Sequence, residues 1–408
     1  MQIAILAVGS RGDVEPMLAL ALGLRDRGHG VRLGALEPFR AMVEGFGLEF
    51  TSLGSLPTRF TRKTGRRRVP TFNGLTGRAL FWAGYTSVLA DRLEGFVQAC
   101  VGADAIVFGG LAFPVCHLAE ALGVPCLWAS PAPHVATRAF ADPFFAGSWY
   151  ATAATWRASY AVEEQLRLQT SAHLVDRWRR DVLGLPRVGR RALGRHVRGL
   201  VRGVLCNSSA VLVPRPADWP GTAHVTGHWR LPTTSWTPSP ALRDFLDAGE
   251  PPIHIGFGSM ADRDPEGFAR LATEAVRRAG VRAVISGLPV EPSDDVFVLD
   301  GAPHDALLPR IAAAVHHGGA GTTAATLEAG VPSVVVPSAY DQFFWAARLQ
   351  RLGVAGRPLV ARGLRAVVRG AAIREVGGVG VRRRAKGLQR AVQGEDGVRT
   401  AVGIIEAA

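Results

Sequence analysis

The sequence predicts an α/β protein built from two doubly wound domains, each a parallel sheet with helices on both faces. Strand-like and helix-like segments alternate in the first half, and the alternation restarts after a proline-rich stretch. A length of 408 residues with 48% hydrophobic residues suits two domains that each bury a core. We expect an N-terminal domain over 1–213, a linker over 214–240 and a C-terminal domain over 241–408, with a cleft between the two domains.

The N-terminal half starts with an apolar run and continues as alternating patterns of period two and period 3.6. A polar, arginine-bearing region between 140 and 202 has helical spacing interrupted near Gly184, which predicts two helices. The remaining patterns predict strands over 3–8, 29–36, 48–53, 103–110 and 124–130, and helices over 14–28, 37–47 and 114–123.

Proline recurs between Val213 and Pro240 and helical periodicity is lost, which indicates an extended connection. The alternation then resumes with strand-and-turn patterns over 251–260 and 312–319. Further patterns predict strands over 281–287, 295–301 and 331–338, and helices over 265–280, 304–311 and 320–330.

The net charge is +13, from 47 Lys and Arg against 34 Asp and Glu. Only Lys63 and Lys386 are lysines, so in a chain rich in Ala and Gly the charge reflects arginine-biased composition and not a nucleic-acid partner. The densest basic run, Arg59–Arg68, is expected to be a solvated, mobile loop that touches an anionic surface or substrate. We expect at most peripheral contact with membranes.

Several features predict a cytoplasmic protein. The most apolar region, 105–129, contains Pro114 and Glu120 and divides into strand and helix signals, so it does not read as a membrane span. The N-terminus lacks the charged leader of a signal peptide. The four cysteines form no CxxC pair and have no histidines at zinc-ligand spacing, which predicts reduced core thiols.

Three turns that follow predicted strands are the candidate binding sites, because ligands of doubly wound sheets bind beyond the carboxyl ends of strands. These turns cover 9–13, 256–259 and 316–322. In the third, glycines allow a ligand close to the backbone, and the next helix would start near Gly321–Thr322 with free N–H groups. His317 and Thr322 add donors, so the turn suits a phosphate or diphosphate. The alternative is a glycine-rich turn with a threonine N-cap.

Two acidic positions have a binding and a structural interpretation. Asp341 and Gln342 follow the strand after that helix, and together they suit the hydroxyls of a sugar or cap the helix that follows. Asp13 follows the first strand and opens a helix. It is either an N-terminal cap or a general base that takes a proton from a substrate hydroxyl.

The motifs GSRGDVEP, VTGHW, FGSM, HHGGAGTT, AGVP and DQ occur in an order that resembles the family 1 glycosyltransferases of the GT-B fold. The resemblance is closest to the bacterial branch that decorates antibiotics of the vancomycin group, together with sterol glycosyltransferases. It implies two Rossmann-like domains and an inverting enzyme. Such an enzyme transfers a sugar from a dTDP- or UDP-linked donor to a hydroxyl of an apolar natural-product or lipid aglycone, with no cofactor and no metal.

The resemblance also implies roles for individual residues. Asp13 corresponds to the general base, His317 and Thr322 to contacts with the diphosphate, and Ser259 to a phosphate contact. The other implied donor-binding residues are Arg11, Gly12, Ala302, His304, Gly318, Gly319, Ala320, Gly321, Asp341 and Gln342.

The sequence departs from the plant branch of the family at two places. Residues 301–304 stand where that branch has a W-x-P-Q box, so the stacking tryptophan is missing. Ala325 stands where it has a glutamate that binds ribose. Both departures are compatible with a dTDP-deoxysugar as the sugar donor.

The acceptor is expected on the N-terminal domain, where aromatic residues flank the basic run or belong to the ordinary core: Phe60, Phe72, Phe81 and Trp82. Two other functions remain compatible with the motifs. One is a non-catalytic partner that binds sugar nucleotides and activates another transferase. The other is a sugar-nucleotide epimerase on the same fold.

Overall fold

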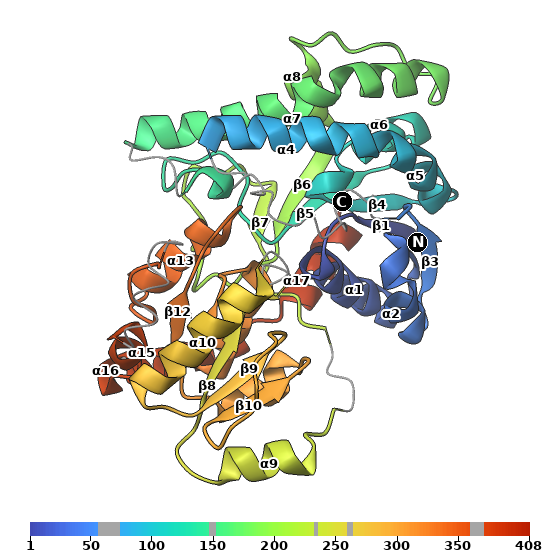
Figure 1. Ribbon diagram of the computed structural model, residues 1–408. Helices are drawn as coiled ribbons and strands as arrows, with labels where there is room; N and C mark the ends of the chain where they lie inside the picture. The colour runs from blue at the N-terminus through green and yellow to red at the C-terminus, as the bar shows by residue number, and fades with distance from the viewer. Residues whose placement is uncertain (56–73, 147–151, 232–235, 259–263, 360–370) are drawn as a thin grey trace. The chain divides into compact units, whose positions relative to one another are not determined.

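The computed structural model describes residues 1–55, 74–146, 152–231, 236–258, 264–359 and 371–408. They form two compact units (Figure 1). Unit 1 comprises Met1–Leu231 and Asp396–Ala408, and unit 2 comprises Pro232–Glu395. Each unit contains one parallel sheet with helices packed on it, which confirms the predicted fold class. The predicted positions Phe60, Phe72, Ser259 and the run Arg59–Arg68 lie outside the described residues.

Unit 1 has a seven-stranded sheet in the order β3-β2-β1-β4-β5-β6-β7, and all described pairings in it are parallel. The winding changes direction between β1 and β4, because β2 and β3 extend the sheet to one side and β4 to β7 extend it to the other. The strands are β1 (Gln2–Ala7), β2 (Gly30–Ala35), β3 (Glu49–Ser52), β4 (Ala105–Gly109), β5 (Cys126–Ser130), β6 (Val201–Cys206) and β7 (Ala223–Val225).

Helices cover both faces of this sheet, because alternate strand residues point to opposite sides. Ile3 and Ile5 share a core with α1 (Arg11–Asp26), α2 (Arg40–Gly45) and α17 (Gly397–Glu406). Ala4 and Leu6 share the other core, with helices that Figure 1 shows on the opposite side. These helices are α4 (Gly74–Leu89), α5 (Leu93–Cys100), α6 (Val115–Leu122), α7 (Ala153–Asp181) and α8 (Leu193–Leu200).

Unit 2 has a five-stranded parallel sheet in the order β10-β9-β8-β11-β12, so its winding changes direction between β8 and β11. The strands are β8 (Ile253–Gly256), β9 (Ala283–Ser286), β10 (Val296–Leu299), β11 (Ala314–His316) and β12 (Ser333–Val335). The helices are α9 (Pro240–Asp247), α10 (Pro265–Ala279), α11 (His304–Leu307), α12 (Ala320–Ala329), α13 (Gln342–Arg351), α15 (Ala371–Val376) and α16 (Val379–Gln393). Ile255 packs with α10 and α15 on one face, and Val284 packs with α9 and α12 on the other.

The compact units differ from the predicted ranges 1–213, 214–240 and 241–408 at two places. Part of the predicted linker belongs to unit 1, because β7 pairs with β6 and Trp229 is buried. The C-terminal helix α17 also belongs to unit 1, where Ala401 and Val402 join the core formed by α1. A strand as short as β7 gives a weak periodic pattern, and the periodicity of a helix such as α17 does not show which unit the helix packs on.

The cysteine prediction agrees with the structure: all four cysteines are free and buried. Burial raises the pKa of each thiol, which makes them poor nucleophiles. Among the described residues, no helix is both long and apolar enough to cross a membrane.

Candidate functional site

In unit 2, the predicted turns after β8 and β11 and the loop after β12 come together at the carboxyl edge of the sheet. These strands are neighbours, and the change of winding direction lies between β8 and β11. A Cβ atom built on Gly258 would lie 3.4 Å from Cε1 of His317. A Cβ built on Gly318 would lie 2.7 Å from Val335 and 3.2 Å from the carbonyl oxygen of Gln342. Motifs that are far apart in the chain are therefore in contact at a switch point, where such sheets bind ligands.

The turn between β11 and α12 exposes backbone donors. Gly318 has a φ of +86°, a conformation that favours glycine, and Gly319 is the N-cap of α12. No side chain caps this helix, so the threonine-cap alternative is wrong. Ala320, Gly321 and Thr322 form the first turn, and their N–H groups have no partner inside the helix. This helix start offers an anion several donors and the positive end of the dipole.

Histidines line this edge, and their burial keeps them neutral. Burial, together with the charge of His304, lowers the pKa of His317 to about 4. His316 lies deeper, accepts a hydrogen bond at Nδ1 from the Gly318 N–H at 3.1 Å, and has a pKa well below its usual value because of burial. At neutral pH these rings act as hydrogen-bonding groups and not as cations. Nδ1 of His317 is buried and has no hydrogen-bond partner among the described residues.

His254, on β8, was not predicted as a site residue. Burial lowers its pKa to about 3, and its Nε2 lies 3.0 Å from the Ser286 hydroxyl. Its ring centroid lies 6.4 Å from that of His304, the first residue of α11. A histidine inside an apolar strand was a visible signal, but the sequence does not show that β8 lies beside β11.

Asp341 and Gln342 differ in how they are held. Asp341 is the N-cap residue of α13 but makes no side-chain cap; its Oδ2 accepts a hydrogen bond from Nε1 of Trp345 at 2.7 Å. The Gln342 side-chain oxygen accepts from the Ser338 and Ala339 N–H groups, at 2.8 and 3.1 Å. These bonds fix the loop and leave the Gln342 amide N–H₂ as the donor available to a ligand.

Tyr340, the residue before this pair, has a φ of +58° and is the one non-glycine residue with positive φ in the described part of the chain. Such a conformation costs roughly 1–2 kcal/mol, so the surrounding loop must hold it. Sequence reasoning missed Tyr340, because tyrosine carries no signal for a left-handed conformation.

At the carboxyl edge of unit 1, Asp13 is exposed and lies in the first turn of α1. Its Oδ2 accepts hydrogen bonds from the Ser10 N–H at 2.7 Å and the Ser10 hydroxyl at 2.9 Å. Asp13 is the N3 residue of a capping box whose N-cap is Ser10, so the cap interpretation of Asp13 is correct as geometry. Exposure beside the change of winding direction between β1 and β4 keeps the catalytic interpretation open.

For the remaining predicted residues that the structure describes, it shows the local contacts but no feature that points to a donor. Arg11 is exposed and pairs with Glu15 at 2.7 Å along its own helix, and Gly12 follows it in the first turn of α1. Ala302 is half-buried against the core that α9 and α11 share. Their roles toward a donor stay predictions.

Trp82 is a core residue, as the alternative interpretation holds. Its ring makes edge-to-face contacts with Phe81 and Phe113, and its Nε1 donates to Glu163 at 2.7 Å. Glu163 also forms a buried ion pair with Arg78. The indole of Trp82 therefore links α4 to α7 in the core of unit 1.

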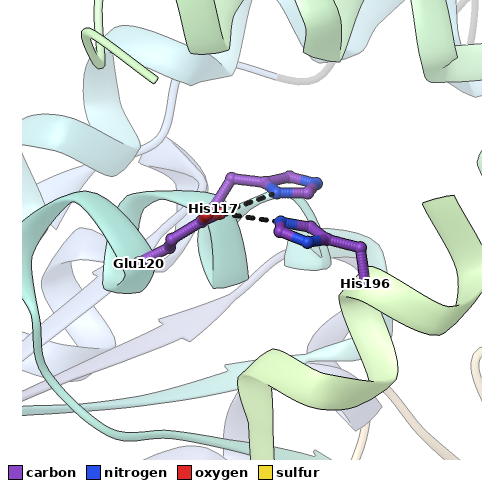
Figure 2. A group of neighbouring side chains, drawn as sticks. All are labelled: His117, Glu120 and His196. Carbon is purple, nitrogen blue, oxygen red and sulfur yellow. Dashed lines mark hydrogen bonds and ion pairs between the residues drawn. The ribbon is translucent and has the colours of Figure 1, made fainter. Parts of the chain in front are cut away.

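One group in the described residues has the spacing of metal ligands: His117, Glu120 and His196 (Figure 2). Nε2 of His196 lies 2.9 Å from Oε2 of Glu120. The buried Arg179 guanidinium, however, forms an ion pair with Glu120 and lies 2.8 Å from Nδ1 of His117. A cation would have to displace this guanidinium, so the group reads as a polar link between α6, α7 and α8.

Comparison with known proteins identifies the relatives of this chain. Residues 3–141 match the glycosyltransferase family 28 N-terminal domain, and residues 270–391 match the erythromycin biosynthesis protein CIII-like C-terminal domain. The O-mycaminosyltylonolide 6-deoxyallosyltransferase of Streptomyces fradiae is 36% identical, over 100% of this chain and 97% of that protein.

A sterol 3-beta-glucosyltransferase of Cryptococcus neoformans is 35% identical over 87% of this chain. The match spans only 24% of that longer protein. Among solved structures, the glycosyltransferase of kitacinnamycin has a TM-score of 0.72 at 22% identity, and the calicheamicin glycosyltransferase CalG4 has 0.70 at 20%. These matches cover 100% of this chain and 98% and 97% of the respective neighbours, and at such identity they show a shared fold. The chain belongs to the GT-B glycosyltransferases, in the branch that contains antibiotic and sterol glycosyltransferases.

Proposed function

We propose that this protein is an inverting glycosyltransferase. It moves a sugar from a dTDP- or UDP-linked donor to a hydroxyl of an apolar macrolide-like or sterol-like aglycone, without a metal. The relatives named above act on a tylonolide derivative and on sterols, and a solved neighbour, the spinosyn rhamnosyltransferase SpnG, is complexed with thymidine diphosphate. These names support the substrate classes.

The observation that carries the donor assignment is the uncapped start of α12 beside the neutral His317. The donor's diphosphate would accept hydrogen bonds from the N–H groups of Ala320, Gly321 and Thr322, from the Thr322 hydroxyl, and from the ring of His317, whose Nδ1 has no hydrogen-bond partner among the described residues. Asp341 and the amide of Gln342 follow the neighbouring strand and suit the hydroxyls of the attached sugar. All these groups belong to unit 2.

In the proposed reaction, Asp13 takes the proton of the acceptor hydroxyl. The oxygen attacks the anomeric carbon from the face opposite the nucleotide, so that the new C–O bond forms as the bond to the diphosphate breaks. The leaving diphosphate keeps the electron pair of that bond, and preorganised donors stabilise its growing charge. General-base assistance of this kind contributes about 10²–10⁴-fold.

The test incubates the purified protein with dTDP- and UDP-sugars, with and without a hydroxylated macrolactone or sterol. We expect nucleoside diphosphate and a glycosylated product of inverted anomeric configuration to form together, and only when acceptor is added. Epimerised nucleotide sugar without an acceptor, or no turnover until a second transferase is added, would refute the proposal in favour of an epimerase or an activator.

A further inference from the structure

We propose that His134, oriented by Asp142, binds the acceptor by taking a hydrogen bond from one of its hydroxyls. Both residues lie in unit 1, in the segment that follows β5. The inference rests on the proposed function, because it assigns a contact to the acceptor of that reaction.

The position of His134 fits a substrate-binding role. β5 is separated from β1 by one strand, β4, so the segments that follow β1 and β5 leave the same edge about 10 Å apart. Asp13 follows β1, and the change of winding direction lies between β1 and β4. His134 therefore emerges beside the place where a doubly wound sheet binds its ligand.

The imidazole of His134 is held in one orientation. Its Nδ1 lies 3.0 Å from Oδ2 of Asp142, whose side chain is 2% exposed. Asp142 is itself fixed, because its Oδ1 accepts from the Phe144 N–H at 3.0 Å and its own N–H donates to Ser159 at 2.8 Å. A carboxylate only accepts hydrogen bonds, so Nδ1 of His134 carries a hydrogen, and in the imidazole form, which has a single ring hydrogen, Nε2 carries the lone pair.

The backbone around His134 is also anchored. The Trp219 indole donates to the carbonyl of Val135 at 3.0 Å. Asp218 accepts from the Thr137 hydroxyl at 2.6 Å and from the Arg138 N–H at 2.9 Å. These three hydrogen bonds restrict the motion of the loop and therefore of the imidazole, which favours a defined contact with a ligand.

The surroundings of His134 suit an apolar ring system. The indole of Trp128 stacks on the imidazole with centroids 5.9 Å apart and planes 6° apart, and the Phe144 ring lies 4.6 Å away. Nε1 of Trp128 is buried and unpartnered among the described residues. A Cβ on Gly110, which follows β4, would lie 3.7 Å from that nitrogen. Aromatic faces with a few directed polar atoms are the usual lining of a small-molecule site.

The buried carboxylate of Asp142 both caps the 3₁₀ helix Pro143–Phe145 and sets the tautomer of His134. The lone pair on Nε2 discriminates between acceptors: it can take a hydrogen bond from a hydroxyl, and it cannot bond to a ketone oxygen at the same place.

The test measures binding of two matched pairs, a 3β-hydroxysterol with its 3-keto analogue and a hydroxylated macrolactone with its keto analogue. We expect the wild-type protein to bind the hydroxyl member of at least one pair roughly 5- to 10-fold more tightly, as for one net hydrogen bond. His134→Phe keeps a ring in the stack and should abolish that preference. His134→Gln, which restores an acceptor oxygen, should recover part of it.

Asp142→Asn should remove the preference, because an amide N–H facing Nδ1 places the hydrogen on Nε2, and an Nε2–H can donate to a hydroxyl oxygen as well as to a ketone oxygen. His173→Phe and Asp181→Asn, at exposed positions of α7, are the matched controls and should leave the preference unchanged. Affinity for dTDP and UDP should be the same in all variants. A preference that survives in His134→Phe, or a wild-type protein without preference in either pair, overturns the inference.

The same preparations are assayed for sugar transfer. Transfer with an unchanged hydroxyl preference in His134→Phe would refute the inference and leave the proposed function standing. Loss of the preference in His134→Phe, together with no sugar transfer by the wild-type protein, would support the inference and refute the proposed function.

Discussion

The carboxyl edges of the two sheets share a topology but carry opposite chemistry. In unit 2 the edge consists of glycines, free backbone N–H groups and neutral histidines. In unit 1 it carries an exposed carboxylate, Asp13, and an aromatic group around His134. The first set suits an anionic ligand and the second suits an apolar ligand with a hydroxyl. The winding of a sheet thus decides where a ligand binds, and the local residues decide which ligand.

Among the changes that test this comparison, the substitution Asp13→Asn should have the largest effect on turnover. The amide oxygen of asparagine can accept the same two hydrogen bonds from Ser10 that Asp13 accepts as the N3 residue of the capping box, so the melting temperature should change little and donor binding should not change. An amide takes no proton near neutral pH, so turnover should fall ~10²-fold or more. Steady-state kinetics, calorimetry with dTDP and UDP, and thermal melting are measured on one preparation. Wild-type turnover in the variant would leave Asp13 as a cap alone.

Gly318→Ala should disrupt the edge of unit 2. The φ of +86° strains any side chain, and the new methyl group would lie 2.7 Å from Val335. We expect a loss of roughly 2–4 kcal/mol in the free energy of unfolding, from both causes together. Urea denaturation measures it. Gly321→Ala is the matched control for stability, because nothing lies within 4 Å of its Cβ, and an equal loss there would contradict the steric account.

Removing single donors should weaken nucleotide binding without unfolding the protein. His317→Ala and Thr322→Ala should each cost roughly 1–3 kcal/mol of binding free energy for dTDP and UDP, the range for a hydrogen bond to a charged group. Calorimetry measures the affinities, with His173→Ala on the exposed face of α7 as control. Unchanged affinity for both nucleotides in both variants would remove the diphosphate from this turn.

Acid should destabilise unit 2 through its buried histidines. Their folded pKa values, about 4 for His317 and about 3 for His254, lie below the ordinary value of 6.5. The unfolded chain therefore binds more protons once the pH falls below 6.5, and stability decreases from there down to the folded pKa values. Each histidine should contribute on the order of 1 kcal/mol per pH unit in that window.

The measurement is urea denaturation of wild type and His254→Gln at pH 7.5, 6 and 5. The variant should lose less stability between pH 7.5 and 5 than the wild type. Equal pH slopes would show that His254 does not titrate between the folded and unfolded states.

Chelation should have the smallest effect. The groups proposed to stabilise the diphosphate are N–H and O–H donors of the protein, so EDTA should leave turnover unchanged. Turnover that EDTA abolishes and magnesium or manganese restores would contradict the metal-free mechanism.

Much of the fold was readable because strand-helix alternation is a local property. The predicted strands at 3–8 and 312–319 correspond to β1 and β11, and the two helices around Gly184 correspond to α7 and α8. Periodicity did not reveal α4, α5, β6 and β7. α4 has apolar residues on several sides, and β7 is three residues long, so neither produces a clear period.

The sequence by itself determined where the glycine-rich turn and the Asp-Gln pair stand relative to the strands. Glycines at 318 and 319, threonines at the start of α12 and Asp-Gln after β12 are contiguous motifs whose backbone preferences are local. Tertiary structure alone decided the rest. Strand order brings Gly258 beside His317 and Gly318 beside Gln342, and burial makes His317 neutral. Packing pairs His134 with Asp142 and returns α17 to unit 1. These properties depend on neighbours distant in the chain, and local periodicity contains no information about them.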